Sequence, residues 1–260
     1  MKKNYLFIII LIIIHIAVLG LINNVKAVMV ISAEKGLEMS IISISQKDDF
    51  VNIQVEYPQF KGIGEAFNDQ ISTFMMREID IFKKNAKGNW EERIATIPPD
   101  QTVSENPMVL CDFIGNWKPV QLNKRYLSFV INIYAFSGGA HGLNGVNAFN
   151  YDMVQKKELT INDFLDNSTK ALQKLSQIAA EQVSAQLQSS GIEIDDVITQ
   201  MIQQGTHPTW DNYQNFNFND NSLIIYFPQY QVAPGYVGQV TITIFKDTLN
   251  ENSIMSDYLK

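Results

Sequence analysis

Histidine and serine are the residue types in this chain that could support hydrolytic chemistry. The three histidines are His15, His141 and His207, and none has another histidine or a cysteine within four positions. Zinc hydrolases usually take three ligands at short, defined spacing, so the pattern predicts no metal site. The GxSxG motif of serine hydrolases is absent as well, because Ala135 stands two positions before Ser137. The sequence therefore predicts no catalytic residue, no metal ligand and no cofactor.

Carboxylate pairs give no clear catalytic signal either. Asp48-Asp49, Glu91-Glu92 and Asp195-Asp196 are adjacent in sequence, so on a strand they would point to opposite faces. Glycosidase carboxylates converge in space instead, and such convergence leaves no local motif. We therefore expect a chain that is not an enzyme. The alternative is an envelope enzyme that binds or modifies peptidoglycan and uses His141.

Two loops contain residues suited to binding. The first, rich in glycine, joins two predicted strands, and its glycines permit positive φ and close approach by another molecule. The second presents tyrosines, which are rigid amphipathic contact residues, beside a proline that fixes the backbone. Both loops also have a purely structural interpretation, as a turn and as side chains packed on a sheet edge. The predicted ligand-binding residues are Ser137, Gly138, Gly139, His141, Tyr230, Pro234 and Tyr236.

Hydrophobic periodicity predicts the elements that must hold these loops. Alternation over 50–57, after an apolar segment at 39–45, predicts an antiparallel hairpin with one solvated face. Apolar residues at three- and four-residue steps predict a long helix over about 64–84, which ends near Gly88.

The second half alternates between blocks of strands and helices. Strands are expected at 108–114, 126–136 and 145–152, then helices at 172–187 and 195–204, then strands at 215–218, 223–227 and 239–245. The first of these helices can be capped by Asn167 or Ser168. Blocks without strict alternation predict an α+β fold, in which two long amphipathic helices pack against antiparallel sheet.

Charge excludes one class of partner. The chain of 260 residues has 20 lysines and arginines against 27 acidic residues, a net charge of −7. Such a surface repels phosphate backbones, and only three arginines are available to bind them in a bidentate manner. Nucleic-acid binding is therefore not expected, whereas a basic partner would be attracted.

The N-terminus carries an export signal. Lysines at positions 2 and 3 precede an apolar run from Tyr5 to Ile22, which Val25-Lys26-Ala27 follows as a candidate cleavage site. The run also reaches the lower limit for crossing a bilayer, so it is either a cleaved signal peptide or a membrane anchor. We expect a leader at 1–27, an N-terminal ββα lobe at 28–100 and a C-terminal α+β lobe at 101–260, with both lobes outside the cytoplasm.

Two motifs resemble a known family. Ser-Gly-Gly-Ala-His-Gly at 137–142 and Tyr-x-Val-Ala-Pro at 230–234, together with Leu-Thr-Ile-Asn-Asp-Phe at 159–164, are similar to the RsiV-type extracytoplasmic domain. That family includes the lysozyme-recognising part of the anti-sigma factor RsiV, and a related non-catalytic region precedes the deacetylase of PdaC. The resemblance covers about 50–245.

The resemblance implies a recognition module. It places Ser137, Pro234 and Tyr236 against a lysozyme cleft, with either a protein such as lysozyme or peptidoglycan as the partner. Only four residues precede the apolar run and the chain ends at Lys260. We therefore expect neither the sigma-binding segment nor the deacetylase domain to carry over. The sequence predicts an exported or membrane-tethered binding module whose two loops lie side by side.

Overall fold

The computed structural model describes residues 9–10, 24–32, 37–48, 50–99, 101, 110–139, 141–252, 254 and 256–259. It divides into two compact units. Unit 1 comprises Met1–Trp117 and Ile133–Leu143, and unit 2 comprises Lys118–Asn132 and Asn144–Lys260. The division passes through three long strands, β5 (Cys111–Leu122), β6 (Tyr126–Phe136) and β7 (Leu143–Asp152). Separate lobes at 28–100 and 101–260 stay a prediction.

The predicted N-terminal hairpin of unit 1 is confirmed. Strands β3 (Leu37–Lys47) and β4 (Val51–Phe60) pair antiparallel, with Ile44 opposite Val55. Asp48 Oδ1 accepts hydrogen bonds from the backbone N–H groups of Phe50 and Val51, which closes the turn between them. The polar side chains of β4 alternate with buried Val51, Ile53 and Val55, as a half-buried strand requires.

The predicted leader lies largely outside the described residues. Two of its pieces are strands, β1 (Ile9–Ile10) and β2 (Asn24–Ser32), and β2 pairs antiparallel with β3. Strand β2 therefore continues across position 27, where we expected the leader to end. Among the helices that the structure describes, none is long and apolar enough to cross a membrane.

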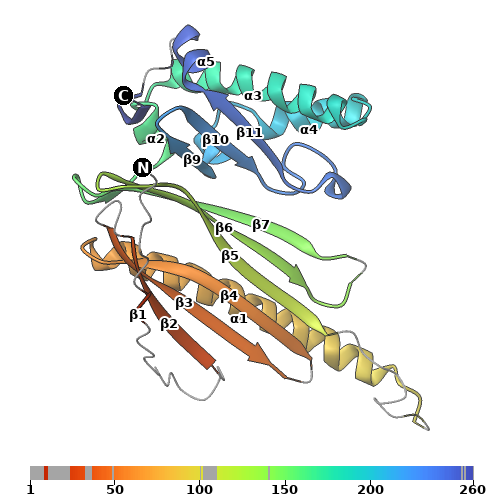
Figure 1. Ribbon diagram of the computed structural model, residues 1–260. Helices are drawn as coiled ribbons and strands as arrows, with labels where there is room; N and C mark the ends of the chain where they lie inside the picture. Colours follow the sequence, from red (N-terminus) through yellow and green to blue (C-terminus); the bar gives the residue numbers. More distant parts are fainter. Residues whose placement is uncertain are drawn as a thin grey trace, which may run out of the picture. The chain divides into compact units, whose positions relative to one another are not determined.

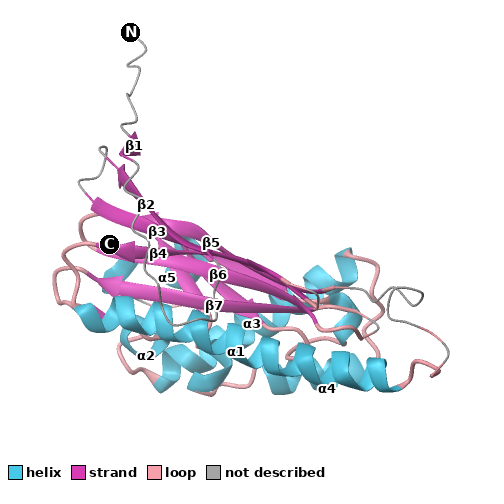
Figure 2. Cartoon of the chain, turned by 90° about the horizontal axis from the view of Figure 1, so that it is seen from below, coloured by secondary structure: helices cyan, strands magenta, loops and turns pink. Residues whose placement is uncertain are grey.

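Helix α1 (Glu65–Ala95) is longer than predicted (Figures 1 and 2). Its buried stripe of Phe67, Ile71, Met75, Ile79, Phe82 and Ala86 has the predicted helical spacing. Our expectation that the helix ends near Gly88 is wrong. Two further turns follow, and in them the Trp90 ring packs 5.9 Å from the Phe50 ring, centroid to centroid. Such packing offsets the cost of about 1 kcal/mol that glycine imposes on a helix interior.

The helix also explains the one parallel pairing that the structure describes. Strand β5 runs parallel to β4, with Val51 opposite Cys111. This pairing is possible because α1 returns the chain to the end of the sheet at which β4 begins. Every other described pairing is antiparallel, as predicted. The large sheet has the order β1-β2-β3-β4-β5-β6-β7-β8, where β8 is Lys157–Glu158.

Unit 2 is built on a smaller antiparallel sheet with the order β11-β10-β9. Its strands are β9 (Phe216–Asn219), β10 (Ser222–Phe227) and β11 (Val240–Phe245). The predicted helices appear as α3 (Thr169–Ser189) and α4 (Asp196–Gly205). Shorter helices complete the unit: α2 (Ile161–Phe164), α5 (Lys246–Glu251), η1 (Trp210–Tyr213), η2 (Gly235–Val237) and η3 (Asp257–Leu259).

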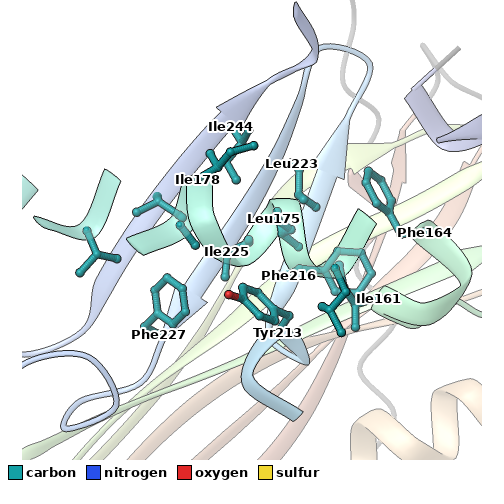
Figure 3. Packing of buried hydrophobic residues seen from close by; sticks show 14 of the residues in the cluster. Ile161, Phe164, Leu175, Ile178, Tyr213, Phe216, Leu223, Ile225, Phe227 and Ile244 are labelled. Atoms are coloured by element: carbon teal, nitrogen blue, oxygen red, sulfur yellow. The ribbon is translucent and has the colours of Figure 1, made fainter. Parts of the chain in front are cut away.

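The core of unit 2 lies between the smaller sheet and its helices (Figure 3). Leu175 and Ile178 of α3 pack with Ile225 and Ile244 of the sheet. Ser168, one of the two predicted caps, begins α3 with its Oγ accepting a hydrogen bond from the Ala171 N–H. The α+β prediction is therefore confirmed in both the types of element and their order.

A buried polar network connects β9 to β6 and β7 within unit 2. Asn217 is fully buried, and its Nδ2 donates to the backbone oxygens of Phe129 and Phe149 at 3.0 and 3.3 Å. Asn150 Nδ2 in turn donates to the Phe216 oxygen at 2.7 Å. Asn217 Oδ1 has no partner among the described residues, so it is the amide N–H groups of Asn150 and Asn217 that favour a single register for β9.

Candidate functional site

The glycine loop, residues 137–142, joins β6 to β7 in unit 1. Helix α1 holds its first residue, because Asn89 Nδ2 donates a hydrogen bond to the Ser137 backbone oxygen at 2.6 Å. Gly138 has a φ of +94°, a conformation that side-chain-bearing residues rarely adopt. The predicted need for glycine is therefore confirmed at position 138, whereas Gly139 has open space around its α-carbon and no such requirement.

A tyrosine ring lies against the end of this loop. A β-carbon built on Gly142 would stand 2.3 Å from the Tyr134 ring, so only glycine fits beneath it. Tyr134 comes from β6 and remains 38% exposed. Sequence reasoning missed this residue, because Tyr134 directly follows the buried Ile133 in a strand-like pattern and nothing in that pattern points to Gly142.

His141 is the group of this loop with potential for proton transfer. Its side chain is exposed, and Nδ1 lies 3.2 Å from the Gly142 backbone oxygen. A carbonyl oxygen only accepts, so this contact is a hydrogen bond in the tautomer whose Nδ1 carries the hydrogen, and that tautomer has its lone pair on Nε2. In the described part of the chain, no group of three histidine, cysteine or acidic side chains could hold a metal ion.

The only cysteine is close to Arg93, the residue of α1 whose Nη1 lies 3.8 Å from the β-carbon position of Gly138. Burial raises the pKa of the Cys111 thiol, an effect that the Arg93 charge opposes and that Asp112 reinforces. The thiol therefore stays protonated at neutral pH and is a poor nucleophile.

The tyrosine loop, residues 228–238, connects β10 to β11 in unit 2. Its middle is part of the core, because Val232 and Ala233 are each only 1% exposed. Gln231 Nε2 donates to the backbone oxygens of Gly205 and Asn212 at 2.9 and 3.1 Å. The glutamine thus connects the loop to the end of α4 and to η1, and these hydrogen bonds fix the position of the middle of the loop.

The two ends of this segment display tyrosines. Tyr236 on η2 is 78% exposed and Tyr230 is 54% exposed, whereas Pro234 is half-buried. The alternative in which Tyr236 packs over the sheet edge is therefore wrong. All eleven residues from Pro228 to Gly238 are uncharged, so this surface offers aromatic faces, hydroxyls and backbone groups. In β10, which leads into the loop, burial raises the pKa of Tyr226 to about 12.

The predicted binding residues divide between the two units. Ser137, Gly138, Gly139 and His141 belong to unit 1, and Tyr230, Pro234 and Tyr236 belong to unit 2. Each loop is therefore a candidate surface of its own unit, and the union of the two loops into one docking patch stays a prediction. Gln229 and Gln231, which organise the tyrosine loop, were not predicted, because glutamines between apolar residues have no distinctive spacing.

Two families match the chain, and each includes one of the loops. The PdaC family, described as deacetylase PdaC, matches residues 44–144, which contain the glycine loop. DUF3298, described as a protein of unknown function, matches residues 162–247, which contain the tyrosine loop. The PdaC relationship that we expected is confirmed, and the relationship to RsiV and to lysozyme recognition stays a prediction.

The chain is similar to curated relatives and to solved structures. It is 30% identical over 200 residues to the peptidoglycan-N-acetylmuramic acid deacetylase PdaC of Bacillus subtilis, covering 77% of this chain and 38% of that protein. It is 30% identical over 111 residues to an esterase of Mycobacterium tuberculosis, covering 43% of this chain and 45% of the esterase. The chain thus spans less than half the length of either relative.

One of the similar solved structures supports the fold alone. A DUF3298 family member from Bacteroides fragilis matches with a TM-score of 0.56 and 15% identity, over 83% of this chain and 93% of that one.

The curated relatives correct one prediction. We expected a chain that is not an enzyme, but both curated relatives are named as enzymes and residues 44–144 match the deacetylase family. That expectation is therefore wrong. It was based on the absence of short catalytic motifs, and such motifs are no guide where the reacting groups come from distant parts of the sequence.

Proposed function

We propose that this chain works at the cell wall, outside the cytoplasm, and engages peptidoglycan through the tyrosine loop. The similarity to PdaC, a protein named for its action on peptidoglycan, supports the choice of polymer. The apolar run and candidate cleavage site at the N-terminus support export. The observation that carries the proposal is the 78% exposure of Tyr236 on a loop whose centre is buried in the core.

The chemistry of the loop suits a glycan strand. A tyrosine presents an apolar face and a hydroxyl, and it loses little conformational entropy on binding. A sugar ring has the complementary combination of C–H faces and hydroxyl groups. Because the loop is uncharged, binding does not require the desolvation of a charged side chain. Its buried centre keeps Tyr236 in position before the ligand binds, which lowers the entropy lost on binding.

Binding to purified insoluble peptidoglycan tests this proposal. The full chain is expected to sediment with peptidoglycan, and Tyr236→Ala is expected to weaken binding by about 2 kcal/mol if the ring is a central contact. Phe245→Ala is a matched control, because Phe245 is an exposed aromatic of the same unit, 62% exposed, outside the loop. An equal loss in both variants, or no sedimentation of the wild type, would contradict the proposal.

Chemical modification of the same polymer is a second candidate function, favoured by the enzyme names of both curated relatives. In deacetylation, water adds to the acetyl carbonyl, the C–N bond breaks, acetate leaves and the nitrogen takes up a proton. An imidazole with a free Nε2 lone pair can accept the proton of that water. The His141 side chain is exposed, and a hydrogen bond from Nδ1 to the Gly142 oxygen would favour this tautomer.

Acetate release from peptidoglycan tests the second candidate. His141→Ala is expected to reduce the rate by 100-fold or more if the ring is the general base, since such groups contribute roughly 10²–10⁴-fold. His207→Ala, which removes another exposed histidine, is the control and should leave the rate unchanged. An unchanged rate in the His141 variant would exclude His141 from the chemistry.

A lysozyme-type protein is the alternative ligand for the tyrosine loop. The net charge of −7 would accelerate its encounter with a basic protein, whereas affinity would depend on buried contacts such as Tyr236. Titration with a c-type lysozyme, followed by muramidase activity, separates the two ligands. Inhibition without sedimentation on peptidoglycan would identify the protein ligand, and no complex at tens of micromolar would exclude it.

A further inference from the structure

Gly235, the residue before the exposed Tyr236, is held from two sides. A β-carbon on Gly235 would stand 2.2 Å from Cζ of Tyr230, so the Tyr230 ring lies directly against the glycine backbone. Gln229 Nε2 donates a hydrogen bond to the Gly235 oxygen at 2.5 Å. Two consecutive residues at the start of the loop therefore contact the residue that presents Tyr236.

Tyr230 makes this contact from an unfavourable backbone conformation. Its φ is +74°, in the left-handed region that glycine and asparagine tolerate and that a bulky aromatic residue rarely adopts. The conformation is fixed by its neighbours, since the Gln231 N–H donates to the Pro228 oxygen at 3.0 Å and Val232 is buried. A residue kept in such a conformation lowers the stability of the folded state, and such residues often lie at functional positions.

We infer that Tyr230 is a positioning residue: its strained backbone places its ring on Gly235, and this contact fixes the orientation of Tyr236 for a glycan. The inference rests on the proposed function. It assigns Tyr230 a role different from that of Tyr236, because Tyr230 acts through Gly235. The conformation of Tyr230 thus lowers the stability of the folded state, and its contact with Gly235 orders the binding surface at position 236.

A matched pair of variants separates the effect of the backbone strain at position 230 from the effect of the aromatic ring. Tyr230→Ala removes the ring and keeps a side chain in the left-handed conformation, whereas Tyr230→Gly removes both the ring and the strain. We expect the glycine variant to melt about 2–4 °C above the alanine variant. Both should bind peptidoglycan at least about 10-fold more weakly than the wild type. Equal melting temperatures, or unchanged binding in both, would overturn the inference.

A double-mutant cycle tests the contact with Gly235. Gly235→Ala places a methyl group where the Tyr230 ring lies, so it should weaken binding strongly in the wild type and have little effect when Tyr230 is already alanine. Equal effects in the two backgrounds would show that the ring and the glycine act independently, which contradicts the inference.

Hydrogen exchange provides a readout that needs no ligand. The amides of Val237 and Gly238 donate to the oxygens of Pro234 and Gly235 at 3.0 and 3.1 Å. Both should exchange faster in Tyr230→Ala than in the wild type, and unchanged exchange would overturn the inference. If the wild type does not bind peptidoglycan, the proposed function fails, while the exchange result still decides whether Tyr230 orders the loop. If only Tyr236→Ala loses binding, the function stands and the inference fails.

Discussion

The glycine loop of unit 1 and the tyrosine loop of unit 2 both place a tyrosine ring on a glycine backbone, yet they are fixed differently. In the glycine loop, the described contact with α1 is the hydrogen bond from Asn89 to the Ser137 oxygen. In the tyrosine loop, Val232 and Ala233 are part of the core and Gln231 binds two further backbone oxygens.

The difference indicates how binding and chemistry could be divided. A loop built into a core keeps its shape, and rigidity lowers the entropy lost on binding. The glycine loop is contacted at its two ends, by Asn89 and by Tyr134, and between them it leaves the His141 side chain exposed to a reacting group. The tyrosine loop is therefore the better candidate for holding a polymer, and the glycine loop is the better candidate for proton transfer.

The largest expected effect tests how the tyrosine loop is fixed. A β-carbon at Gly205 would stand 2.2 Å from the Gln231 backbone oxygen, which cannot move without displacing the loop. Gly205→Ala should lower the free energy of unfolding by about 1–3 kcal/mol, measured by urea denaturation. Gly139→Ala in the glycine loop meets no atom within 4 Å and is the control. A decrease of less than about 0.5 kcal/mol in the free energy of unfolding for Gly205→Ala would mean that the contact between Gly205 and Gln231 does not fix the loop.

The second prediction concerns pH and strand β10, which leads into the tyrosine loop. Burial raises the pKa of Tyr226 to about 12, above the usual 10 of an unfolded chain. The stability from the neutral hydroxyl is therefore complete below pH 10 and is lost as the pH rises towards 12, by about 1 kcal/mol at pH 11. Tyr226→Phe should be less sensitive than the wild type to alkaline denaturation between pH 10 and 12. Identical pH profiles would contradict this assignment.

The smallest effect is expected at the glycine loop. Asn89→Ala removes the part-buried hydrogen bond to the Ser137 oxygen and should cost about 0.5–1 kcal/mol of stability, the net contribution of a typical intramolecular hydrogen bond. Hydrogen exchange should accelerate in residues 137–142 and stay unchanged in residues 228–238. Equal acceleration in both loops would show that the two are not independently fixed.

The elements of the fold were predictable because their signals are local. The strand at 126–136 has the predicted bounds, and Ser168 caps α3 as expected. Helix α1 continues beyond Gly88, where the Trp90 ring packs against the Phe50 ring, and this contact joins residues that are distant in sequence. The parallel pairing of β4 with β5 depends in the same way on a crossover that no local pattern encodes.

The candidate site was predictable only in part. The need for glycine at position 138 follows from residue type, whereas the exposure of Tyr236 was left open between a binding contact and packing on the sheet edge. The contacts of Tyr134 with Gly142 and of Tyr230 with Gly235 do not follow from residue type, because each depends on the final path of a loop. A tyrosine at a φ of +74° contradicts residue preferences, so the sequence itself would place glycine or asparagine there.

Hydrogen exchange with and without soluble muropeptide fragments compares the two loops most directly. We predict slower exchange on ligand addition at the Val237 and Gly238 amides, with residues 137–142 unaffected by the binding step. Protection confined to 137–142, with no change in 228–238, would contradict the account that the tyrosine loop holds the polymer.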